Sequence, residues 1–397
     1  MATKLYFSRD TKVIAHVPMG TGSPATTKNM YYDLPVLDGF SFSQAMNTSE
    51  ITLNEAQNIS GASRRGRTMF NDSFAPVEWS FSTYMMPFTA SGGTVGTAGK
   101  AGADGAHHEV SEALWAMFFG QTVNAGLDSD ATNLDIVQTG ANKATIGVFD
   151  LYFVLGASQA ATAYTYTIGA GAANQMIYKI SDCSVGEASF DFDLDGIATV
   201  NWSGNGKIIQ EHTNTTFTTG NTLIYEGVSN KSGFIRNRIS DLTMLGDSGG
   251  GAGGGSDVAY VTTLTGGNIT MSNNLTYLTP ETLGVVNQPL GHVTGSKSIG
   301  GNFTCYLDNA SDYTSAELYE DLVEATTDIQ NSFSLRFDIG AGTNPFCLLT
   351  METCHLEVPT HSIEEVISME TNFHALPSDF DSTDEITAFQ FYGNDVS

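Results

Sequence analysis

Alternating apolar and polar residues recur along the chain and predict strands. The segment Phe149 to Gly156, FDLYFVLG, carries large apolar residues at every second position and stops at a glycine. The segment Phe333 to Gly340, FSLRFDIG, repeats this pattern. A side-chain period of two is that of a strand with one buried face. Each segment is therefore predicted to be a strand that buries one face.

Two short segments have a helical pattern instead. The sequences SEALWAMFF, at 111–119, and SAELYEDLV, at 315–323, are predicted to be short amphipathic helices. Thr314 and Glu317 have the spacing of a capping box at the start of the second helix. Gly120 follows the first helix and is a natural C-terminal cap.

These segments belong to two series of matches that run in the same order and predict a duplicated fold. The matched residues are Phe81, Tyr84 and Met85 with Phe303, Tyr306 and Leu307; Leu114, Trp115 and Phe118 with Leu318, Tyr319 and Leu322; the two strands above; and Cys183 and Trp202 with Cys354 and Phe373. The first copy is longer, and its extra residues are rich in Gly, Ala, Thr and Ser, as surface loops are.

The predicted fold class is mainly β, a duplicated β-sandwich or partial barrel in which each copy carries one short α-helix. We expect an N-terminal arm at 1–32, a first domain with enlarged loops at 33–212, and a second domain at 220–377 with a Gly-rich insertion near 246–256. An acidic tail at 378–397 ends in ITAFQFYGN, an alternating segment suited to an edge strand.

Charge narrows the range of functions. The 397-residue chain has 43 acidic residues against 16 Lys and Arg, a formal net charge of −27. Such a surface repels nucleic acid, although it does not exclude a protein that encloses DNA without gripping it. Acidity that serves only solubility is the alternative. We expect neither a signal peptide nor a membrane span, and the four cysteines are expected to be buried thiols.

Three motifs suggest chemistry that their surroundings do not support. The sequence GDSGG around Ser248 resembles that of a serine protease, but glycines continue beyond it and no histidine has the matching sequence setting. The sequence DFDLDG at 191–196 imitates a calcium loop, but its twelfth position is Trp202 and not Glu. His107 and His108 have no accompanying ligands and are expected to be solvated. We therefore predict no catalytic residue, metal or cofactor.

The same DFDLDG segment is better explained as a β-hairpin. Asp195 and Gly196 are expected to form its turn, which would place Asp193 near Ala198 and Asp191 near Val200. Asp191, Asp193 and Asp195 then form an acidic row that either lines a wet space or faces open solvent. The basic cluster SRRGR, which holds Arg64, Arg65 and Arg67, either meets an acidic partner, including a second copy of this chain, or is a solvated loop.

Four segments resemble tail tube proteins of long-tailed, sheath-free bacteriophages. Both SFDFDLDGIATVNWSGNG, at 189–206, and LEVPTHSIEEVISMETNFHAL, at 356–376, resemble the closing hairpin of the tube domain. GHVTGSKSIGGNFTCYLDN, at 291–309, resembles the strand before its helix, and GFIRNRIS, at 233–240, resembles the start of a tube domain. The resemblance covers both copies.

The resemblance implies a structural virion protein and not an enzyme. Single-domain members form sixfold rings that stack into a tube, so three two-copy chains are expected to close a pseudo-sixfold ring. Long hairpins, here Asn47 to Phe74 and Tyr277 to His292, would reach the adjacent ring. The candidate contacts between subunits or rings are Arg64, Arg65, Arg67, Phe70, Leu278 and Leu283, and the candidate lumen residues are Asp191, Asp193 and Asp195.

The implied partners are other copies of the chain, the tape-measure protein, the tail terminator and the baseplate or tip proteins. Double-stranded DNA would pass during ejection without specific binding, and no membrane is involved. The implied location is the virion tail, after assembly in the host cytoplasm. The alternative function is a phage adhesin or decoration protein that binds a host-surface glycan.

Overall fold

The fold is that of a computed structural model. It describes residues 7–17, 30–53, 58–62, 66–89, 107–120, 133–136, 146–156, 167–168, 176–212, 215–216, 222–224, 233–246, 258–279, 283, 288–309, 313–324, 333–340 and 344–395. The described elements are mostly antiparallel strands, so the predicted mainly-β fold class is confirmed.

The elements of the N-terminal half are η1 (Ser8–Asp10), β1 (Lys12–Val17), β2 (Met30–Leu34), β3 (Ser41–Ile51), β4 (Thr68–Tyr84), β5 (Pro87–Thr89), β6 (His107–Glu109), α1 (Glu112–Phe119), β7 (Leu134–Asp135), β8 (Phe149–Leu155), β9 (Thr167–Ile168), β10 (Met176–Asp193), β11 (Thr199–Gly206), β12 (Ile208–Glu211), β13 (Thr215–Thr216) and β14 (Thr222–Ile224). Those of the C-terminal half are η3 (Asn237–Ile239), β15 (Asp241–Gly246), β16 (Val258–Val261), β17 (Leu264–Ser272), β18 (Leu275–Leu278), β19 (Gly291–Thr294), β20 (Ser298–Tyr306), α2 (Ser315–Glu324), β21 (Phe333–Ile339), β22 (Phe346–Leu356), β23 (Thr360–Ile363), β24 (Ile367–Ala375), β25 (Ala388–Tyr392) and β26 (Asn394–Asp395).

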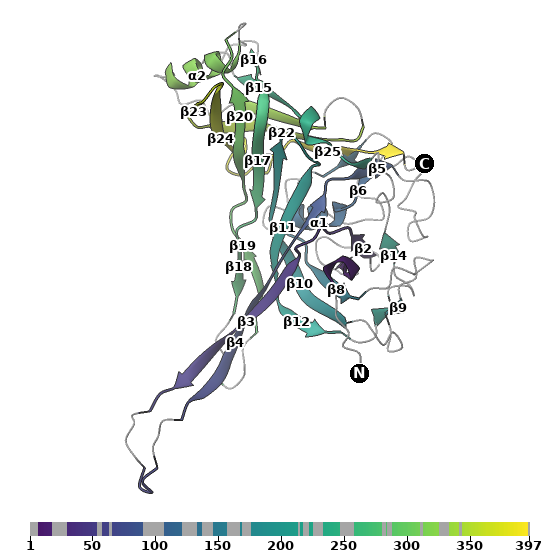
Figure 1. The fold of residues 1–397 in the computed structure, drawn as a ribbon, viewed down its shortest axis with the longest axis vertical. Coiled ribbons are helices and arrows are strands. Elements are labelled where there is room, and N and C mark those ends of the chain that lie inside the picture. The colour runs from purple at the N-terminus through teal and green to yellow at the C-terminus, as the bar shows by residue number, and fades with distance from the viewer. Residues whose placement is uncertain are drawn as a thin grey trace.

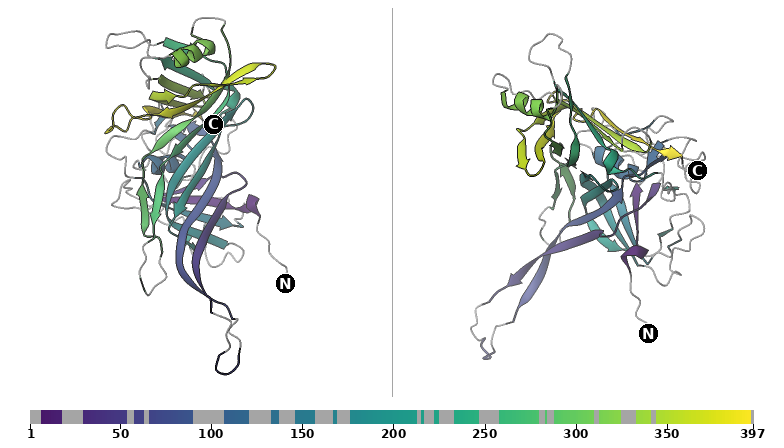
Figure 2. Two further views of the ribbon diagram at one scale, coloured as in Figure 1. Left: turned by 90° about the vertical axis from the view of Figure 1, so that its left-hand side faces the viewer. Right: turned by 45° about the horizontal axis from the view of Figure 1, so that its top comes forward.

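One antiparallel sheet runs through both halves, and we call it the joined sheet. Its strand order is β3-β4-β11-β10-β17-β20-β24-β23. The halves meet where β10 pairs with β17, from Glu187 opposite Ser272 to Asp193 opposite Gly266. The left view of Figure 2 looks toward this sheet from the side away from the body.

A second layer of strands covers the inner face of the joined sheet. In the first half its order is β2-β1-β8-β10-β12, and in the second it is β16-β15-β21-β22-β25-β7. Strands β10 and β22 belong to both layers, because each pairs with one layer in its first part and with the other in its last part. Strands that change sheets in this way close the corners of a barrel.

The two halves share a detail at the point where these long strands change layers. Cys183 of β10 lies opposite Phe149, and Cys354 of β22 lies opposite Phe333. Both cysteines are buried and reduced. The sequence match had paired the same four residues, and this recurrence supports a duplication; the domain bounds themselves remain a prediction.

Helix α1 differs from the amphipathic helix that was expected. All of its residues are buried, including Glu112. Trp115 lies at the centre of the core, with its ring 4.5 Å from Trp202 of the joined sheet and 4.7 Å from Phe389 of β25. A helix enclosed between two layers needs no polar face. Gly120 ends the helix with a φ of 69°, as the sequence predicted.

Strand β8 also departs from its prediction. Tyr152 and Val154, on the face expected to be polar or solvated, are buried with Ile14, Tyr31 and Ile177 in a second, smaller core. The matching strand β21 keeps the predicted alternation, with Phe333, Leu335, Phe337 and Ile339 buried.

The C-terminal tail is more deeply integrated than expected. Strand β25 lies between β22 and β7, so it is not an edge strand. Phe389 and Phe391 are fully buried. Strand β26 then pairs in parallel with β5 of the first half. The last described residues therefore connect both halves instead of forming an acidic surface tail.

Two hairpins leave the same end of the joined sheet. The longer, formed by β3 and β4, projects far from the body, and β18 and β19 form a shorter one beside it (Figure 1). We call the part of the β3–β4 hairpin beyond Gln44 and Val77 the arm; the name does not refer to the N-terminal segment. The ranges where the sequence predicted long hairpins, 47–74 and 277–292, lie inside these two hairpins.

Candidate assembly surfaces

The outer face of the joined sheet is polar and acidic. Its side chains follow from the alternation of each strand, since Val77, Trp79 and Phe81 point into the core and their neighbours point outward. The outward residues of the central strands are Glu78, Ser80, Ser82, Asn201, Ser203, Asn205, Glu187, Ser189, Asp191, Asp193, Asn268, Thr270, Ser272, Ser298, Asn302, Thr304, Ser368, Glu370, Asn372 and His374. This described set contains five carboxylates and no Lys or Arg.

Hydrogen bonds between neighbouring strands order this face. The Ser82 hydroxyl donates to Asn201 Oδ1 at 2.7 Å. In the second half, Asn302 Nδ2 donates to Glu370 Oε1 at 2.8 Å, and Asn372 Nδ2 donates to Glu357 Oε2 at the same distance. Cross-strand polar pairs of this kind stabilise a solvated sheet face.

The three candidate lumen acids have different surroundings. Asp191 lies between Thr199 of β11 and Asn268 of β17, one residue away from the predicted partner Val200. The expected positions were wrong because the turn is wider than two residues, with Leu194, Asp195 and Gly196 all outside the strands. Asp193 lies opposite Gly266 and is exposed.

Asp195 is the exception among the three. It lies in the turn itself and its Oδ1 is 3.2 Å from Nη1 of Arg238, at a site where both side chains are largely exposed. It belongs to the end of the sheet and not to its outer face.

Each end strand of the joined sheet has one open edge among the described residues. Strand β3 pairs with β4, and β23 pairs with β24, and neither has a described strand on its other side. On β23 the exposed fraction of Ile363 reaches 80%. An exposed strand edge with apolar side chains is a site where another strand can add.

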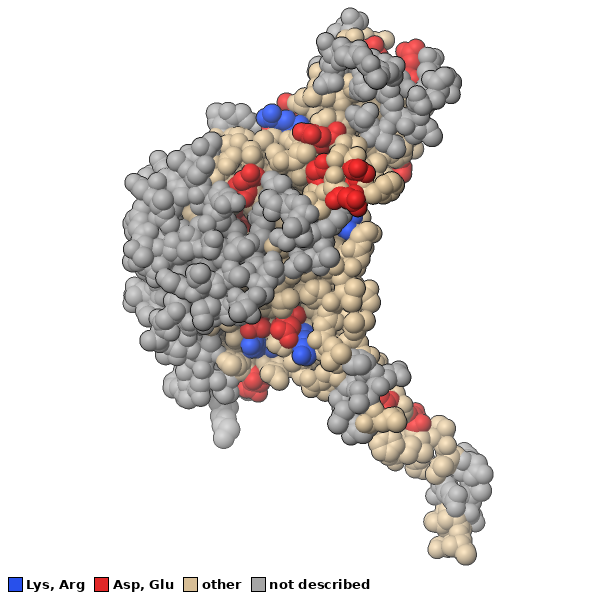
Figure 3. Space-filling model, turned by 180° about the vertical axis from the view of Figure 1, so that it is seen from behind, with Lys and Arg blue, Asp and Glu red and all other residues tan. Residues whose placement is uncertain are grey.

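The arm exposes an unusual number of apolar side chains. Leu53, Ile59, Met69 and Phe70 are all more than half exposed. In the space-filling view, the described part of the projecting arm consists mostly of residues other than Lys, Arg, Asp and Glu (Figure 3). Large exposed apolar residues gathered on one projection mark a surface that binds another molecule.

The candidate contact residues are found on both hairpins. Arg67 holds Glu50 of the same arm through two hydrogen bonds, of 2.5 and 2.6 Å, while Arg64 and Arg65 lie outside the described residues. On the shorter hairpin, Leu278 is half exposed and Leu283 is fully exposed. Sequence reasoning had named these leucines but had missed Leu53 and Ile59.

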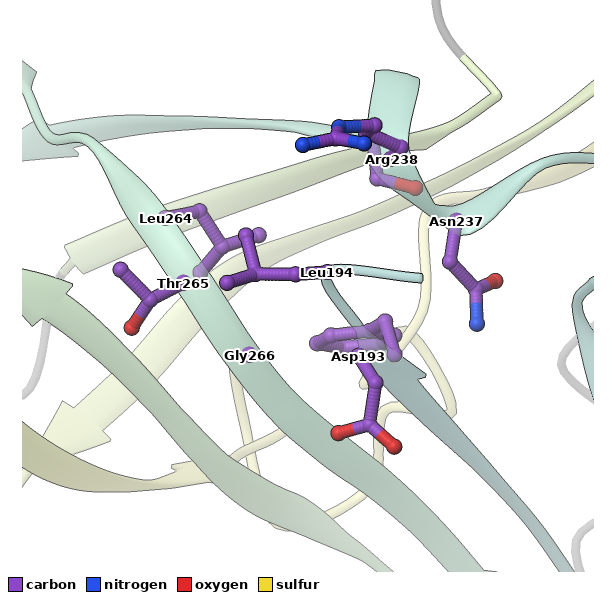
Figure 4. Close-up of a pocket in the computed structure, with 9 residues that line it drawn as sticks. Asp193, Leu194, Asn237, Arg238, Leu264, Thr265 and Gly266 are labelled. Atoms are coloured by element: carbon purple, nitrogen blue, oxygen red, sulfur yellow. The ribbon is translucent and has the colours of Figure 1, made fainter. Parts of the chain in front are cut away.

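A small surface pocket lies where the two halves meet, at the end of the sheet away from the arm. Leu194 and Asp193 of the first half face Leu264, Thr265 and Gly266 of β17, with Asn237 and Arg238 of η3 above them (Figure 4). The pocket contains one acid and one base and has no arrangement suited to catalysis.

The motifs that suggested chemistry are accounted for in part. Ser248 lies outside the described residues, and the strands on either side of its loop, β15 and β16, pair as a hairpin. No group of metal-binding side chains occurs among the described residues, nor does a described helix have the length and apolarity to cross a membrane.

The expectation of solvated histidines at 107–108 is wrong. His107 and His108 are buried, because the segment before α1 is enclosed by β5 and the C-terminal strands. His108 Nδ1 is 2.9 Å from Glu112 Oε2, and His107 Nδ1 accepts the Gly393 N–H at 2.8 Å. Their role is in folding the core.

Glu109, next to these histidines, is a buried acid. Its carboxylate accepts the Ser111 N–H and hydroxyl, both at 2.7 Å. Burial raises the pKa of Glu109 to about 8, against the lowering effect of those hydrogen bonds. The Met86 N–H also donates to its Oε1 at 3.3 Å, so Glu109 joins the start of α1 to the end of β4 within the core.

Comparison with known proteins points to one kind of relative. No protein-family model matches the chain. The chain is 27% identical over 391 residues to tail tube protein pb6 of Escherichia phage T5, and the match spans 96% of this chain and 75% of the relative. The resemblance to phage tail tube proteins is therefore confirmed along nearly the whole chain.

Proposed function

We propose that this chain is the structural subunit of a phage tail tube. Its similarity to a phage tail tube protein extends over both halves, and its described surfaces are suited to assembly, not to catalysis. The proposed location is the virion tail, where the tube would contact other tail proteins. Assembly in the host cytoplasm follows from this role.

The observation that carries the proposal is the join between β10 and β17. Strand β10 is the fourth strand of the joined sheet and β17 is the fifth. Their pairing makes the sheet of one half continuous with the sheet of the other. The open edges, β3 and β23, are the first and last strands of the same sheet. Pairing β23 of one chain with β3 of the next would repeat this junction and leave no exposed edge.

Ile363 supports this pairing. It lies nine residues after Cys354, as Phe192 lies nine residues after Cys183. Phe192 is buried at the β10–β17 junction, while Ile363 is 80% exposed. This difference in exposure is explained if a second chain covers Ile363 when it pairs with the open edge of β23.

Three chains would then close a pseudo-sixfold ring from six similar halves. The polar face of the joined sheet would line the lumen, with Glu78, Glu187, Asp191, Asp193 and Glu370 facing the passing DNA. Lys or Arg on that face would add attraction to phosphates, and the described outward residues include neither. The rings would stack through the arm and the shorter hairpin to form a conduit for DNA ejection.

The test is electron microscopy of the purified chain with a matched pair of variants. The wild type is expected to form rings with threefold or pseudo-sixfold symmetry. Ile363→Lys places a charge on the open edge and is expected to abolish rings while the chain stays folded, since the side chain is exposed in the single chain. Phe380→Lys, at a 99% exposed site in the 378–387 segment, is the control and should still form rings.

Two results would refute the pairing. One is a wild type that stays monomeric under all conditions, including in the presence of other tail components. The other is a ring population for Ile363→Lys equal to that of Phe380→Lys.

A further inference from the structure

The layer of strands beneath the joined sheet is repeated in the two halves. Strands β1, β8, β10 and β12 of the first half correspond in order to β15, β21, β22 and β25 of the second. Tyr178 of β10 and Leu349 of β22 each lie five residues before the matched cysteine of their strand. Glu211 of β12 lies opposite Tyr178, and Phe389 of β25 lies opposite Leu349. Tyr178 is therefore equivalent to Leu349, and Glu211 to Phe389.

Within the chain, helix α1 of the first half is covered by residues of the second half. The Phe389 ring is 4.7 Å from that of Trp115 and 6.1 Å from that of Phe119. At the end of the helix, Asn273 Nδ2 donates to the Phe118 carbonyl at 3.1 Å. As a result Phe119 is only 2% exposed. The helix of one half is thus held by the half that follows it.

Helix α2, the equivalent of α1, is much less covered in the single chain. The sequence match pairs Tyr319 with Trp115 and places Val323 at the position of Phe119. Tyr319 and Leu322 are only partly buried, and Val323 is 49% exposed. Helix α2 therefore presents apolar side chains that are buried at the corresponding positions of α1.

The first half has a matching apolar surface beside β3, the first strand of the joined sheet. Phe40, Phe42, Tyr178 and Ile209 pack against the core but are only partly buried, and we call these four residues the first-half flank. The rings of Phe42 and Tyr178 are 5.5 Å apart. Leu349, the equivalent of Tyr178, is fully buried in the core that β25 and α1 share. The flank is thus the surface that a preceding helix would cover.

We propose that α2 of one chain packs on the first-half flank of the neighbouring copy in the ring. This inference rests on the proposed function, because it requires β23 to pair with β3 of the next chain as β10 pairs with β17. Helix α2 would then meet the next chain as α1 meets the second half. Identical subunits in a closed ring repeat one contact, and this contact removes from water apolar area that both surfaces expose in the single chain.

One pair of residues distinguishes this contact from the one inside the chain. Glu211, which is exposed, occupies the position of Phe389, and Tyr319 occupies that of Trp115. An aromatic pair inside the chain is therefore replaced by a phenol and a carboxylate, and the phenol would donate a hydrogen bond to the carboxylate. Polar groups at these two positions keep both surfaces hydrated before assembly, whereas the pair inside the chain is never exposed.

The test links the positions equivalent to Phe119 and Phe389 in assembled rings. Val323→Cys with Glu211→Cys, treated with a short bis-maleimide, is expected to give covalently linked pairs and triplets of chains on a denaturing gel. The four native cysteines are buried. The controls are each single substitution and Phe380→Cys with Glu211→Cys. They are expected to leave the chains unlinked, although the Phe380 site is 99% exposed and its thiol accessible.

Val323→Lys gives a second measurement, by electron microscopy. It is expected to lower the ratio of ring-bound to free chains about tenfold relative to Phe380→Lys, equivalent to ~1.4 kcal/mol. Its urea denaturation should match that of the wild type, since Val323 is half exposed in the single chain.

Rings of the double-cysteine variant that remain unlinked would overturn the inference while leaving the ring proposal intact. A ring population for Val323→Lys equal to that of Phe380→Lys would also overturn it. A wild type without rings would instead refute the proposed function, so the two failures are distinguishable.

Discussion

At the scale of single residues, burial decides which polar groups have a structural role. Four of the six residues at 107–112 have ionisable side chains, and all four are buried: His107, His108, Glu109 and Glu112. Their sequence resembles an ordinary polar loop before a helix. The signal that they are enclosed lies elsewhere in the chain, in the C-terminal residue Gly393, whose N–H donates to His107.

Glu109 leads to a prediction about pH. Burial raises its pKa to about 8, while the same carboxyl in the unfolded chain ionises near its ordinary pKa of 4.5. The stability that depends on neutral Glu109 is therefore complete below about pH 4.5 and is lost as the pH rises toward about 8, with a slope of at most ~1.4 kcal/mol per pH unit. Glu109→Gln keeps a neutral side chain at every pH.

The measurement is the free energy of unfolding of both proteins by urea, from pH 5 to 9. The stability of Glu109→Gln relative to the wild type is expected to increase with pH up to about 8 and then level off. Other titrating groups are common to both proteins and cancel in the difference. Parallel curves would show that Glu109 ionises normally.

At the scale of elements, the C-terminal strand β25 is a part of the core whose importance its sequence understated. It inserts between β22 of one half and β7 of the other, and its phenylalanines contact α1. The residues before it, from Ser378 to Ser382, lie at the surface, where Ser378 makes hydrogen bonds with Ser382 and Asp384. One short segment therefore contains both a surface loop and a core strand.

Two phenylalanines of this segment give a matched comparison. Phe389→Ala removes a fully buried ring and is expected to cost ~3–5 kcal/mol of unfolding free energy. Phe380→Ala, at a 99% exposed position, is expected to change it by less than ~0.5 kcal/mol. Urea denaturation followed by tryptophan fluorescence reports both values. Equal, small effects would mean that β25 is only an appendage.

At the scale of the whole molecule, the distribution of charge between faces matters more than the net charge. The 43 acids and 16 Lys and Arg of the chain give a net charge of −27. The property proposed for the lumen is different: one continuous sheet face has acids and, among the described outward residues of its central strands, no Lys or Arg. A protein could have the same net charge and still present basic rows to DNA.

This arrangement predicts the effect of making the face basic. Asp191→Lys with Asp193→Lys is expected to make assembled tubes retain double-stranded DNA at low salt and release it at high salt, since phosphate contacts are salt-dependent. Retention of a labelled DNA fragment by pelleted tubes is the measurement. Asp379→Lys with Asp381→Lys adds the same charge outside the sheet face and should retain less. Equal retention would place Asp191 and Asp193 outside the lumen.

The sequence by itself determined the local features of this protein. The alternation at 333–340, the glycine that ends α1 and the matched cysteines all depend on neighbours within a few residues, so periodicity and spacing were enough to predict them. The acidic composition and the resemblance to tail tube proteins were equally visible in the linear chain.

Only the tertiary structure decided which strands meet. The wider turn at 194–196, the burial of both faces of β8 and the insertion of β25 between two halves all depend on residues far away in the chain. The same holds for the open edges of the joined sheet at β3 and β23. Side-chain periodicity defines the faces of a strand, whereas its partners are selected by long-range packing that a local pattern does not encode.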